Sequence, residues 1–243
     1  MTEVAGSAAV GQKPGFAMLY RAGSIAAMVT VGLTITQIVL GVLWPPPDFA
    51  PTAAVAEKML QMAQTHPVRA FVTLDGLMVV DYLLLFVVYL GLYAALRDRE
   101  PSLMALGTGL ALMAITLYFT VNPSITMFVL AGQYSAGAAD AAGVVTAAQA
   151  ALATFEGTAF IVHYLVMGVA GILVSLAMLR GTTFSRATGV AGVLQGAMML
   201  VPVTFGMLGL IFAVGSLIPF IVWFVLVAIR LSRIATEAVP LRS

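Results

Sequence analysis

Charged residues are scarce in this sequence. Of its 243 residues only 9% are charged, whereas 61% are hydrophobic and the mean hydropathy is +1.06. A soluble domain carries about 25% charged residues, so this chain cannot cover a water-facing surface and we expect lipid to be its main solvent. Cysteine is absent, which excludes disulfides, thiolate nucleophiles and cysteine-ligated metals. The formal net charge of +1 argues against a nucleic-acid partner, since a phosphate-binding face needs clustered Lys and Arg.

What the sequence does have is long apolar runs. Backbone polar groups cannot stay unsatisfied in hydrocarbon, so each run is interpreted as a helix, and about 20 residues cross the bilayer core. We predict an all-α, polytopic transmembrane helical bundle over residues 18–234, between a polar tail at 1–17 and a second tail at 235–243. The six predicted spans cover about residues 18–44, 68–96, 103–121, 158–179, 187–207 and 208–231. The first run is too long for a signal-peptide core of about 7 to 15 residues, so we expect it to be retained.

The basic residues predict the orientation of the bundle. If the N-terminus is inside, nine of them fall on the cytoplasmic side and only Lys58 and Arg69 fall outside. An even number of spans then places both termini in the cytoplasm. The nine inside residues are Lys13, Arg21, Arg97, Arg99, Arg180, Arg186, Arg230, Arg233 and Arg242.

Two segments outside the spans have helical composition. Residues 52–65 follow a triple proline that ends the first span, and their mixed apolar and polar pattern suits a helix at the membrane surface. Residues 124–155 are alanine-rich and mildly polar, which predicts one or two short helices. We expect these short helices to cap the outer face of the bundle.

Polar side chains within the spans are the candidates for chemistry, because ionisable groups in a bilayer are expensive and usually face the protein interior. Asp75 lies seven residues into the second span, His163 lies six residues past Gly157, and Gln37 lies seven residues before the end of the first span. At 1.5 Å per residue all three are about 10 Å from the outer boundary. We therefore predict a buried pocket in the outer half, in which Asp75 and His163 pair directly beside Gln37.

Further polar residues surround this predicted pocket. Arg69 and Glu156 both fall at the outer boundary, and we expect them to form an ion pair above it. Tyr118 and Ser216 are expected nearby. Asp81 is deeper, about 20 Å from the outer boundary. Burial without a cationic partner favours its neutral form, which can transfer a proton or hydrogen-bond a neighbouring helix.

Asp75 and Asp81 are not predicted to act as an acid and base pair. A six-residue spacing rotates the second carboxyl by about 600°, which leaves the two about 120° apart on one helix. The purely structural interpretation of these polar residues is that they form hydrogen bonds between helices. A ligand or proton site is the alternative. A haem between His66 and His163, the only histidines, would require them to converge; we predict no metal and no cofactor.

Several strings carry a family resemblance over about residues 18–234. They are Arg21-Ala22-Gly23, 75–97, Gln133-Tyr134, 152–160, Met178-Leu179-Arg180, Phe184-Ser185, Pro202, Trp223 and Arg230-Leu231. With these strings the chain resembles a family of bacterial six-span membrane proteins that is defined only as a domain of unknown function. The resemblance implies a multi-pass location in a bacterial plasma membrane and supplies no catalytic residues.

Enzyme signatures such as HExxH, GxSxG and a Walker loop are missing from the sequence. We expect a protein that binds or passes a small molecule or a proton through an outward-facing polar pocket, with membrane lipids as its other partners. One alternative is a membrane-embedded enzyme acting on a lipid or quinone, which predicts a lateral opening beside convergent polar groups. Another is a non-catalytic accessory subunit, which predicts an exposed stripe of small residues such as Gly189, Gly192 and Gly196.

Overall fold

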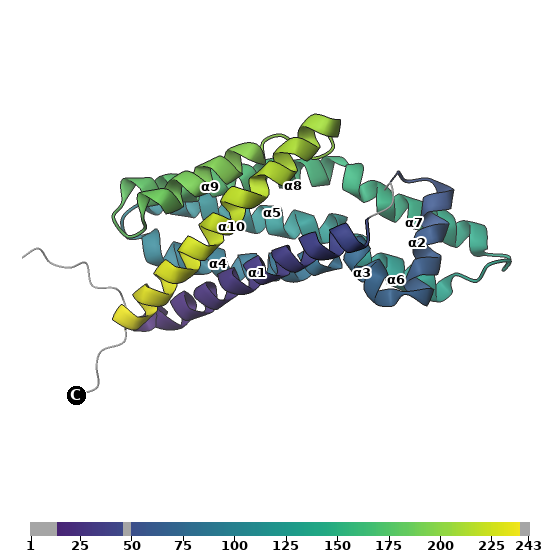
Figure 1. Ribbon diagram of the computed structural model, residues 1–243, viewed down its shortest axis with the longest axis horizontal. Coiled ribbons are helices and arrows are strands. Elements are labelled where there is room, and N and C mark those ends of the chain that lie inside the picture. Colours follow the sequence, from purple (N-terminus) through teal and green to yellow (C-terminus); the bar gives the residue numbers. More distant parts are fainter. Residues whose placement is uncertain (1–13, 46–49, 239–243) are drawn as a thin grey trace, which may run out of the picture.

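The computed structural model describes residues 14–45 and 50–238, and every regular element in these ranges is a helix (Figure 1). In chain order the elements are η1 (Pro14–Phe16), α1 (Ala17–Leu43), α2 (Ala53–Thr65), α3 (Pro67–Thr73), α4 (Gly76–Leu96), α5 (Pro101–Val121), α6 (Ser124–Gln133), α7 (Ala141–Ala153), η2 (Thr154–Glu156), α8 (Thr158–Arg180), α9 (Arg186–Met198) and α10 (Gly206–Glu237). The prediction of an all-α chain is confirmed for this part of the protein.

Five helical stretches of the described chain are long and apolar enough to cross a membrane. They are Ala17–Leu43, Gly76–Leu96, Pro101–Gln133, Ala141–Arg180 and Gly206–Glu237. The chain is therefore a multi-pass membrane protein. The 33 residues of Pro101–Gln133 extend over about 50 Å, well beyond a hydrocarbon core of about 30 Å. This stretch and Ala141–Arg180 thus continue out of the bundle, through short breaks, into α6 and α7.

The predicted helix over 187–207 does not form as one element. Helix α9 covers only Arg186–Met198, 13 residues or about 20 Å, and the chain then runs through turns to Gly206. Pro202 has no amide hydrogen to donate, and Gly206 has a φ of +62°, a left-handed conformation that suits glycine. These two residues end the helical pattern that hydropathy alone predicts to continue.

The predicted span over 68–96 is also interrupted. The chain forms α3 and α4 as separate helices, joined at Asp75, whose φ of +56° makes it the one non-glycine residue with positive φ in the described chain. Aspartate tolerates this conformation better than most side chains. Gly76 follows because a β-carbon there would collide with the ring of Phe71. Asp75 is therefore a junction residue rather than part of a straight span.

Six helices form a closed ring. In chain order α1 packs on α4, α4 on α5, α5 on α8, α8 on α9 and α9 on α10, and α10 returns to α1. Small residues allow the close contacts. Gly23 of α1 meets Gly91 of α4, and Gly168 of α8 meets Gly196 of α9, where added β-carbons would approach the facing backbone. Large apolar side chains such as Ile218 stay exposed on the outside of the ring, as expected for a lipid-facing surface.

The glycine stripe of α9 is buried inside the chain. Gly189 packs on α8, Gly192 lies between Ser175 of α8 and Trp223 of α10, and Gly196 lies on α8. These glycines therefore allow α9 to pack closely on α8 and α10. An exposed stripe, which the accessory-subunit hypothesis requires, is not present at these positions.

The cap at one end of the ring is built from α2, α3, α6 and α7 (Figure 1). It has an apolar cluster of its own, which includes Met59, Leu60, Met127 and Leu152. Gln64 joins α2 to the end of α6 by donating to the carbonyl oxygens of Ala131 and Tyr134, both at 2.7 Å. Helix α2 thus packs its apolar face on other cap helices, and its position at the membrane surface stays a prediction.

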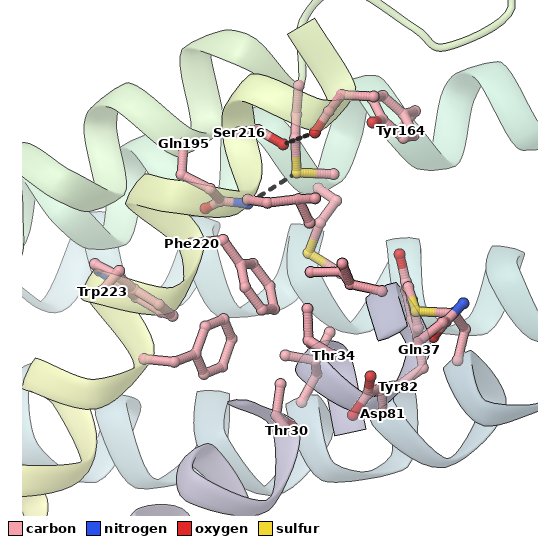
Figure 2. A pocket seen from close by; sticks show the side chains of 18 of the residues that line it. Thr30, Thr34, Gln37, Asp81, Tyr82, Tyr164, Gln195, Ser216, Phe220 and Trp223 are labelled. Atoms are coloured by element: carbon pink, nitrogen blue, oxygen red, sulfur yellow. Dashed lines mark hydrogen bonds between the residues drawn. The ribbon is translucent and has the colours of Figure 1, made fainter. Parts of the chain in front are cut away.

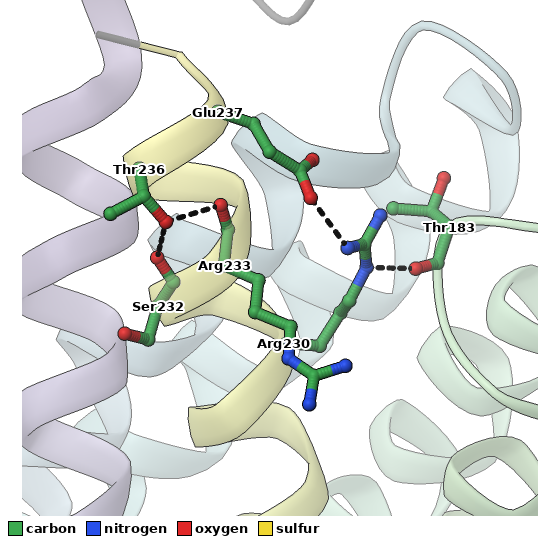
Figure 3. A network of polar contacts seen from close by, with 6 residues as sticks. All are labelled: Thr183, Arg230, Ser232, Arg233, Thr236 and Glu237. Atoms are coloured by element: carbon green, nitrogen blue, oxygen red, sulfur yellow. Dashed lines mark hydrogen bonds and ion pairs between the residues drawn. The ribbon is translucent and has the colours of Figure 1, made fainter.

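The opposite end of the ring gathers the basic residues and both ends of the described chain, the start of α1 and the end of α10 (Figure 1). Arg230 of α10 donates to the carbonyl oxygen of Thr183 and pairs with Glu237 at 3.3 Å (Figure 3). Arg180 pairs with Glu100 at 3.6 Å. Helix α10 continues to Glu237, past the predicted start of the C-terminal tail at 235. Residues 1–13 and 239–243 of the predicted tails, with Lys13 and Arg242, lie outside the described residues.

Candidate functional site

A cavity of about 520 Å³ lies inside the ring, between α1, α4, α8, α9 and α10. Figure 2 shows Asp81 of α4 beside Thr30 and Thr34 of α1, with Gln195 of α9 and Ser216 of α10 on the far side. A cavity of this size matches the usual range for small-molecule sites, about 300 to 1,000 Å³. Most of the lining is apolar, so the few polar side chains decide which molecule fits.

Some polar atoms in the cavity wall lack a hydrogen-bond partner among the described residues. They are Asp81 Oδ1 and Gln37 Oε1; the Thr30 hydroxyl lies close enough to the Asp81 carboxyl to act as its hydrogen-bond donor. Asp81 is only 2% exposed. An unpaired buried polar group costs about 1 to 3 kcal/mol, so these groups are expected to be satisfied by something that occupies the cavity.

Asp75 and Gln37 come together as predicted. Gln37 Nε2 donates to Asp75 Oδ1 at 3.0 Å, which joins α1 to the start of α4. This bond also fixes the amide orientation, since a carboxylate accepts only from the nitrogen side. Gln37 Oε1 is thereby left as an acceptor. Asp75 and Asp81 both line the cavity, contrary to the 120° separation predicted for one helix, because Asp75 precedes α4 in a left-handed conformation.

The predicted direct pair of Asp75 and His163 does not form. His163 is 1% exposed, and its Nε2 lies 2.9 Å from the hydroxyl of Tyr82, while its Nδ1 lies 3.0 Å from the carbonyl oxygen of Ala114. A carbonyl can only accept, so Nδ1 carries the hydrogen and Nε2 accepts from Tyr82. Both ring nitrogens are used in tying α8 to α4 and α5. His163 therefore acts as a structural bridge beside the cavity.

Tyr82 and Tyr118 lie between the surroundings of His163 and those of Asp75. Their rings stack at a centroid distance of 3.9 Å and an interplanar angle of 14°. Asn122 Nδ2 donates to the Tyr118 hydroxyl at 2.9 Å and to the backbone carbonyl of Asp75 at 3.2 Å. His163 and Asp75 thus share a neighbourhood through Tyr82, Tyr118 and Asn122. The expectation that Tyr118 lies near the pocket is confirmed, and Ser216 lines the cavity itself.

The predicted outer ion pair is wrong. Arg69 and Glu156 are both exposed, and the ion pairs of the described residues do not include a contact between them. The break at Asp75 makes α3 part of the cap, so a depth count along one straight helix does not apply to Arg69. His66 is exposed at the junction of α2 and α3, whereas His163 is buried within α8, so the two histidines do not converge as a shared haem would require.

An aromatic wall forms one side of the cavity. Trp223 packs edge-on against Phe224 at 4.8 Å and lies 6.5 Å from the ring of Tyr89, and Phe220 lies 4.4 Å from Phe224. Trp223 is only 2% exposed. Figure 2 shows Phe220 and Trp223 along α10, on the same cavity that holds Asp81.

The mouth of the cavity lies between α1 and α10. These helices meet near the basic end, where Ser24 Oγ donates to the Ala228 carbonyl oxygen at 2.8 Å, and they diverge toward the cap (Figure 1). Three residues both line the cavity and are exposed, namely Ile38 at 39%, Leu210 at 48% and Val214 at 57%. All three are apolar and lie on membrane-spanning helices. The rim therefore suits contact with hydrocarbon rather than with water.

Several lining residues that the fold brings together could not be predicted from the sequence. Thr30, Gln195 and the aromatic wall are ordinary residues for apolar helices, so composition gave no reason to single them out. The one available signal was Trp223, a tryptophan in the middle of a predicted span, because tryptophan is more common at membrane interfaces.

Comparison with protein-family models, with curated proteins and with solved structures finds no match for this chain. The family resemblance therefore stays a prediction, and the function must be argued from the cavity.

Proposed function

We propose that this protein binds a lipid-soluble small molecule, which reaches the cavity sideways from the bilayer through the mouth between α1 and α10. The observation that carries the proposal is the rim, since Ile38, Leu210 and Val214 are exposed and apolar on membrane-facing helices. A molecule dissolved in hydrocarbon can pass such a rim without leaving an apolar environment. The lateral opening is also what the alternative of an enzyme acting on a lipid or quinone predicts, and binding of a lipid-soluble molecule is common to both.

The chemistry of the lining supports an amphipathic ligand. Aromatic and methionine side chains, among them Trp223 and Met167, would bury an apolar body. The buried polar atoms of Asp81, Thr30 and Gln37 would hold a polar end. This combination fits the general pattern of ligand sites, in which apolar walls supply affinity and a few polar groups supply orientation.

The proposal includes six membrane crossings with both termini on the cytoplasmic side. Helix α9 takes its place in the ring between α8 and α10 although it is short, and the following turns complete that crossing. The basic end of the ring carries seven Arg residues, whereas the cap end carries Lys58 and Arg69. The positive-inside rule then assigns the basic end to the cytoplasm, as in the plasma-membrane location that the resemblance implies.

Orientation can be tested with single cysteines, because the natural chain has none. Ser135→Cys lies between the cap helices α6 and α7, and Ser102→Cys lies in the first turn of α5; both serines are exposed. A maleimide that cannot cross membranes should label Ser135→Cys in intact cells and Ser102→Cys only after permeabilisation. Labelling of both in intact cells, or of Ser102→Cys alone, would contradict the proposed orientation.

Binding can be tested through Trp223, because the chain has only two tryptophans. In a Trp44→Phe protein in lipid nanodiscs, 4-(4-bromophenyl)butan-1-ol should quench Trp223 in a saturable manner, since bromine quenches tryptophan on contact. The control protein carries Trp44→Phe, Trp223→Phe and Ile218→Trp, which places the tryptophan at a site 72% exposed to lipid. Its quenching should rise linearly with concentration. Linear or absent quenching of Trp223 would refute a binding cavity.

A further inference from the structure

We propose that the ligand of this cavity is a lipophilic amine, held as its ammonium ion by Asp81 and covered by the aromatic wall. This inference rests on the proposed function and names the chemical class of its ligand. Its starting point is the contrast between the two carboxyls of the cavity, since Asp75 accepts a hydrogen bond from Gln37 and Asp81 Oδ1 has no partner among the described residues.

Asp75 is already engaged. It accepts a hydrogen bond from Gln37 and lies at the start of α4, where the positive end of the helix dipole favours a carboxylate. Asp81 is in the second turn of α4 and 2% exposed, its Oδ1 is unpartnered, and the group beside its carboxyl is the neutral Thr30 hydroxyl. Among the described residues that line the cavity, none is Lys, Arg or His. An ionised Asp81 therefore finds its charge partner only in a ligand that brings a positive charge into the cavity.

The neighbouring polar atoms define the hydrogen-bonding character of that ligand. Gln37 Oε1 is an acceptor because its amide nitrogen is bound to Asp75, and the Thr30 hydroxyl can also accept. Together with Asp81 Oδ1, they present acceptors to the cavity. A primary ammonium group supplies hydrogen-bond donors and a positive charge, which suits Asp81 and the Thr30 hydroxyl beside it, whereas a carboxylate or phosphate would be repelled by Asp81.

The aromatic wall adds a second feature that suits a cation. Tyr89, Phe220, Trp223 and Phe224 form a connected cluster on the cavity. Aromatic faces attract organic cations, most strongly where water is excluded, and tryptophan is the best of them. The same wall accepts the apolar body of the molecule, so one surface serves both parts of a lipophilic amine.

The test compares two ligands of the same shape in the Trp44→Phe protein. 4-(4-Bromophenyl)butan-1-amine is a cation at neutral pH and 4-(4-bromophenyl)butan-1-ol is neutral, and both quench through the same bromine. Concentrations are expressed per lipid after the partitioning of each compound has been measured. A charge-assisted hydrogen bond predicts that the amine half-saturates Trp223 quenching at a concentration about tenfold or more below that of the alcohol.

Variants assign the preference to one carboxyl. Asp81→Asn should bring the two half-saturating concentrations within about threefold of each other. Glu57→Gln, the same chemical change at an exposed cap residue, should retain the full preference. Equal binding of amine and alcohol in the Trp44→Phe protein would overturn the inference without any variant. A preference that survives Asp81→Asn and is lost in Asp75→Asn would also overturn it.

The failure of this inference can be told apart from the failure of the proposed function. If the alcohol and the amine both saturate Trp223 at equal concentrations, the cavity binds lipid-soluble molecules and only the amine preference is wrong. If neither compound gives saturable quenching, the proposed function fails together with the inference. Because the ligand comparison needs no change at Asp81, a poorly folding Asp81→Asn protein does not remove the test.

Discussion

Replacing Tyr82 by phenylalanine removes a single oxygen from the buried contact between α4 and α8. In the native chain that hydroxyl donates to His163 Nε2 at 2.9 Å, while Nδ1 donates to the Ala114 carbonyl oxygen. The ring of Tyr82 also stacks on Tyr118 at 3.9 Å. Phenylalanine keeps the ring and its stacking, so the change isolates one hydrogen bond.

The expected cost follows from what is left behind. His163 is 1% exposed, so Nε2 would remain as a buried acceptor without a donor. An unsatisfied buried group costs about 1 to 3 kcal/mol, whereas hydrogen bonds between membrane helices average about 0.6 kcal/mol, with a maximum near 1.7. We therefore expect Tyr82→Phe to lower the free energy of unfolding by about 1 to 1.5 kcal/mol.

The measurement is reversible unfolding in mixed micelles, with Tyr93→Phe as the matched control on the same helix. Tyr93 is half-buried, its ring lies under the guanidinium of Arg97, and its hydroxyl makes no hydrogen bond to a described residue. Its loss should change stability by less than about 0.5 kcal/mol. Nitrogen-15 NMR of labelled histidine adds a local readout. His163 Nδ1 should carry the hydrogen in the native protein and in Tyr82→Phe, whereas the chemical shift of Nε2 should change in Tyr82→Phe and stay as in the native protein in Tyr93→Phe.

Two results would refute this reasoning. One is a Tyr82→Phe protein as stable as the native chain with an unshifted Nε2, which would mean that the hydrogen bond is not made. The other is a native spectrum in which Nε2 carries the hydrogen, because His163 would then donate to Tyr82 and could not donate to Ala114.

The remaining predictions concern the packing of the ring. Gly196→Ala should lower the free energy of unfolding by about 2 kcal/mol or more in an unfolding titration, since its β-carbon would lie 2.6 Å from a carbonyl oxygen of α8. The control Gly32→Ala, whose β-carbon would meet nothing within 4 Å, should raise it by up to about 1 kcal/mol. Equal effects of the two variants would contradict the close approach of α8 and α9. Asp75→Val should be less stable than Asp75→Gly by about 1 to 2 kcal/mol, because only glycine accepts the φ of +56° without strain, and the reverse order would argue for a continuous helix. Ser24→Ala should cost about 0.6 kcal/mol by removing a bond from α1 to α10, and no loss of thermal stability would mean that the bond adds nothing.

Hydropathy predicted the membrane-spanning character well and the continuity of helices poorly. The runs at 18–44, 103–121, 158–179 and 208–231 all became helices with nearly the predicted starts. The two failures are at Asp75 and at Pro202 to Gly206, where backbone geometry interrupts an apolar run. Hydropathy averages over side chains, so it does not register a single left-handed residue.

The candidate site was predicted in part, because the depth of a residue in the membrane predicts which residues lie at the same level but not which way their side chains point. Gln37 and Asp75 were matched by their distance from the membrane boundary, and they are bonded to each other. His163 has a similar depth, but depth says nothing about direction around the helix. It points to Tyr82 and Ala114, and the pair with Asp75 is absent for that reason.

The sequence by itself determined the solvent of this protein and the elements it can form, because an apolar chain of 243 residues with 9% charge must satisfy its backbone within helices. The basic residues likewise predict which end of the bundle faces the cytoplasm. Only the tertiary structure decided that six helices close into a ring, that α1 and α10 diverge to open a mouth, and that the described residues lining the cavity give Asp81 no cationic partner. These features depend on how helices turn toward one another, and that direction is set by close contacts at residues such as Gly23, Gly168 and Gly196.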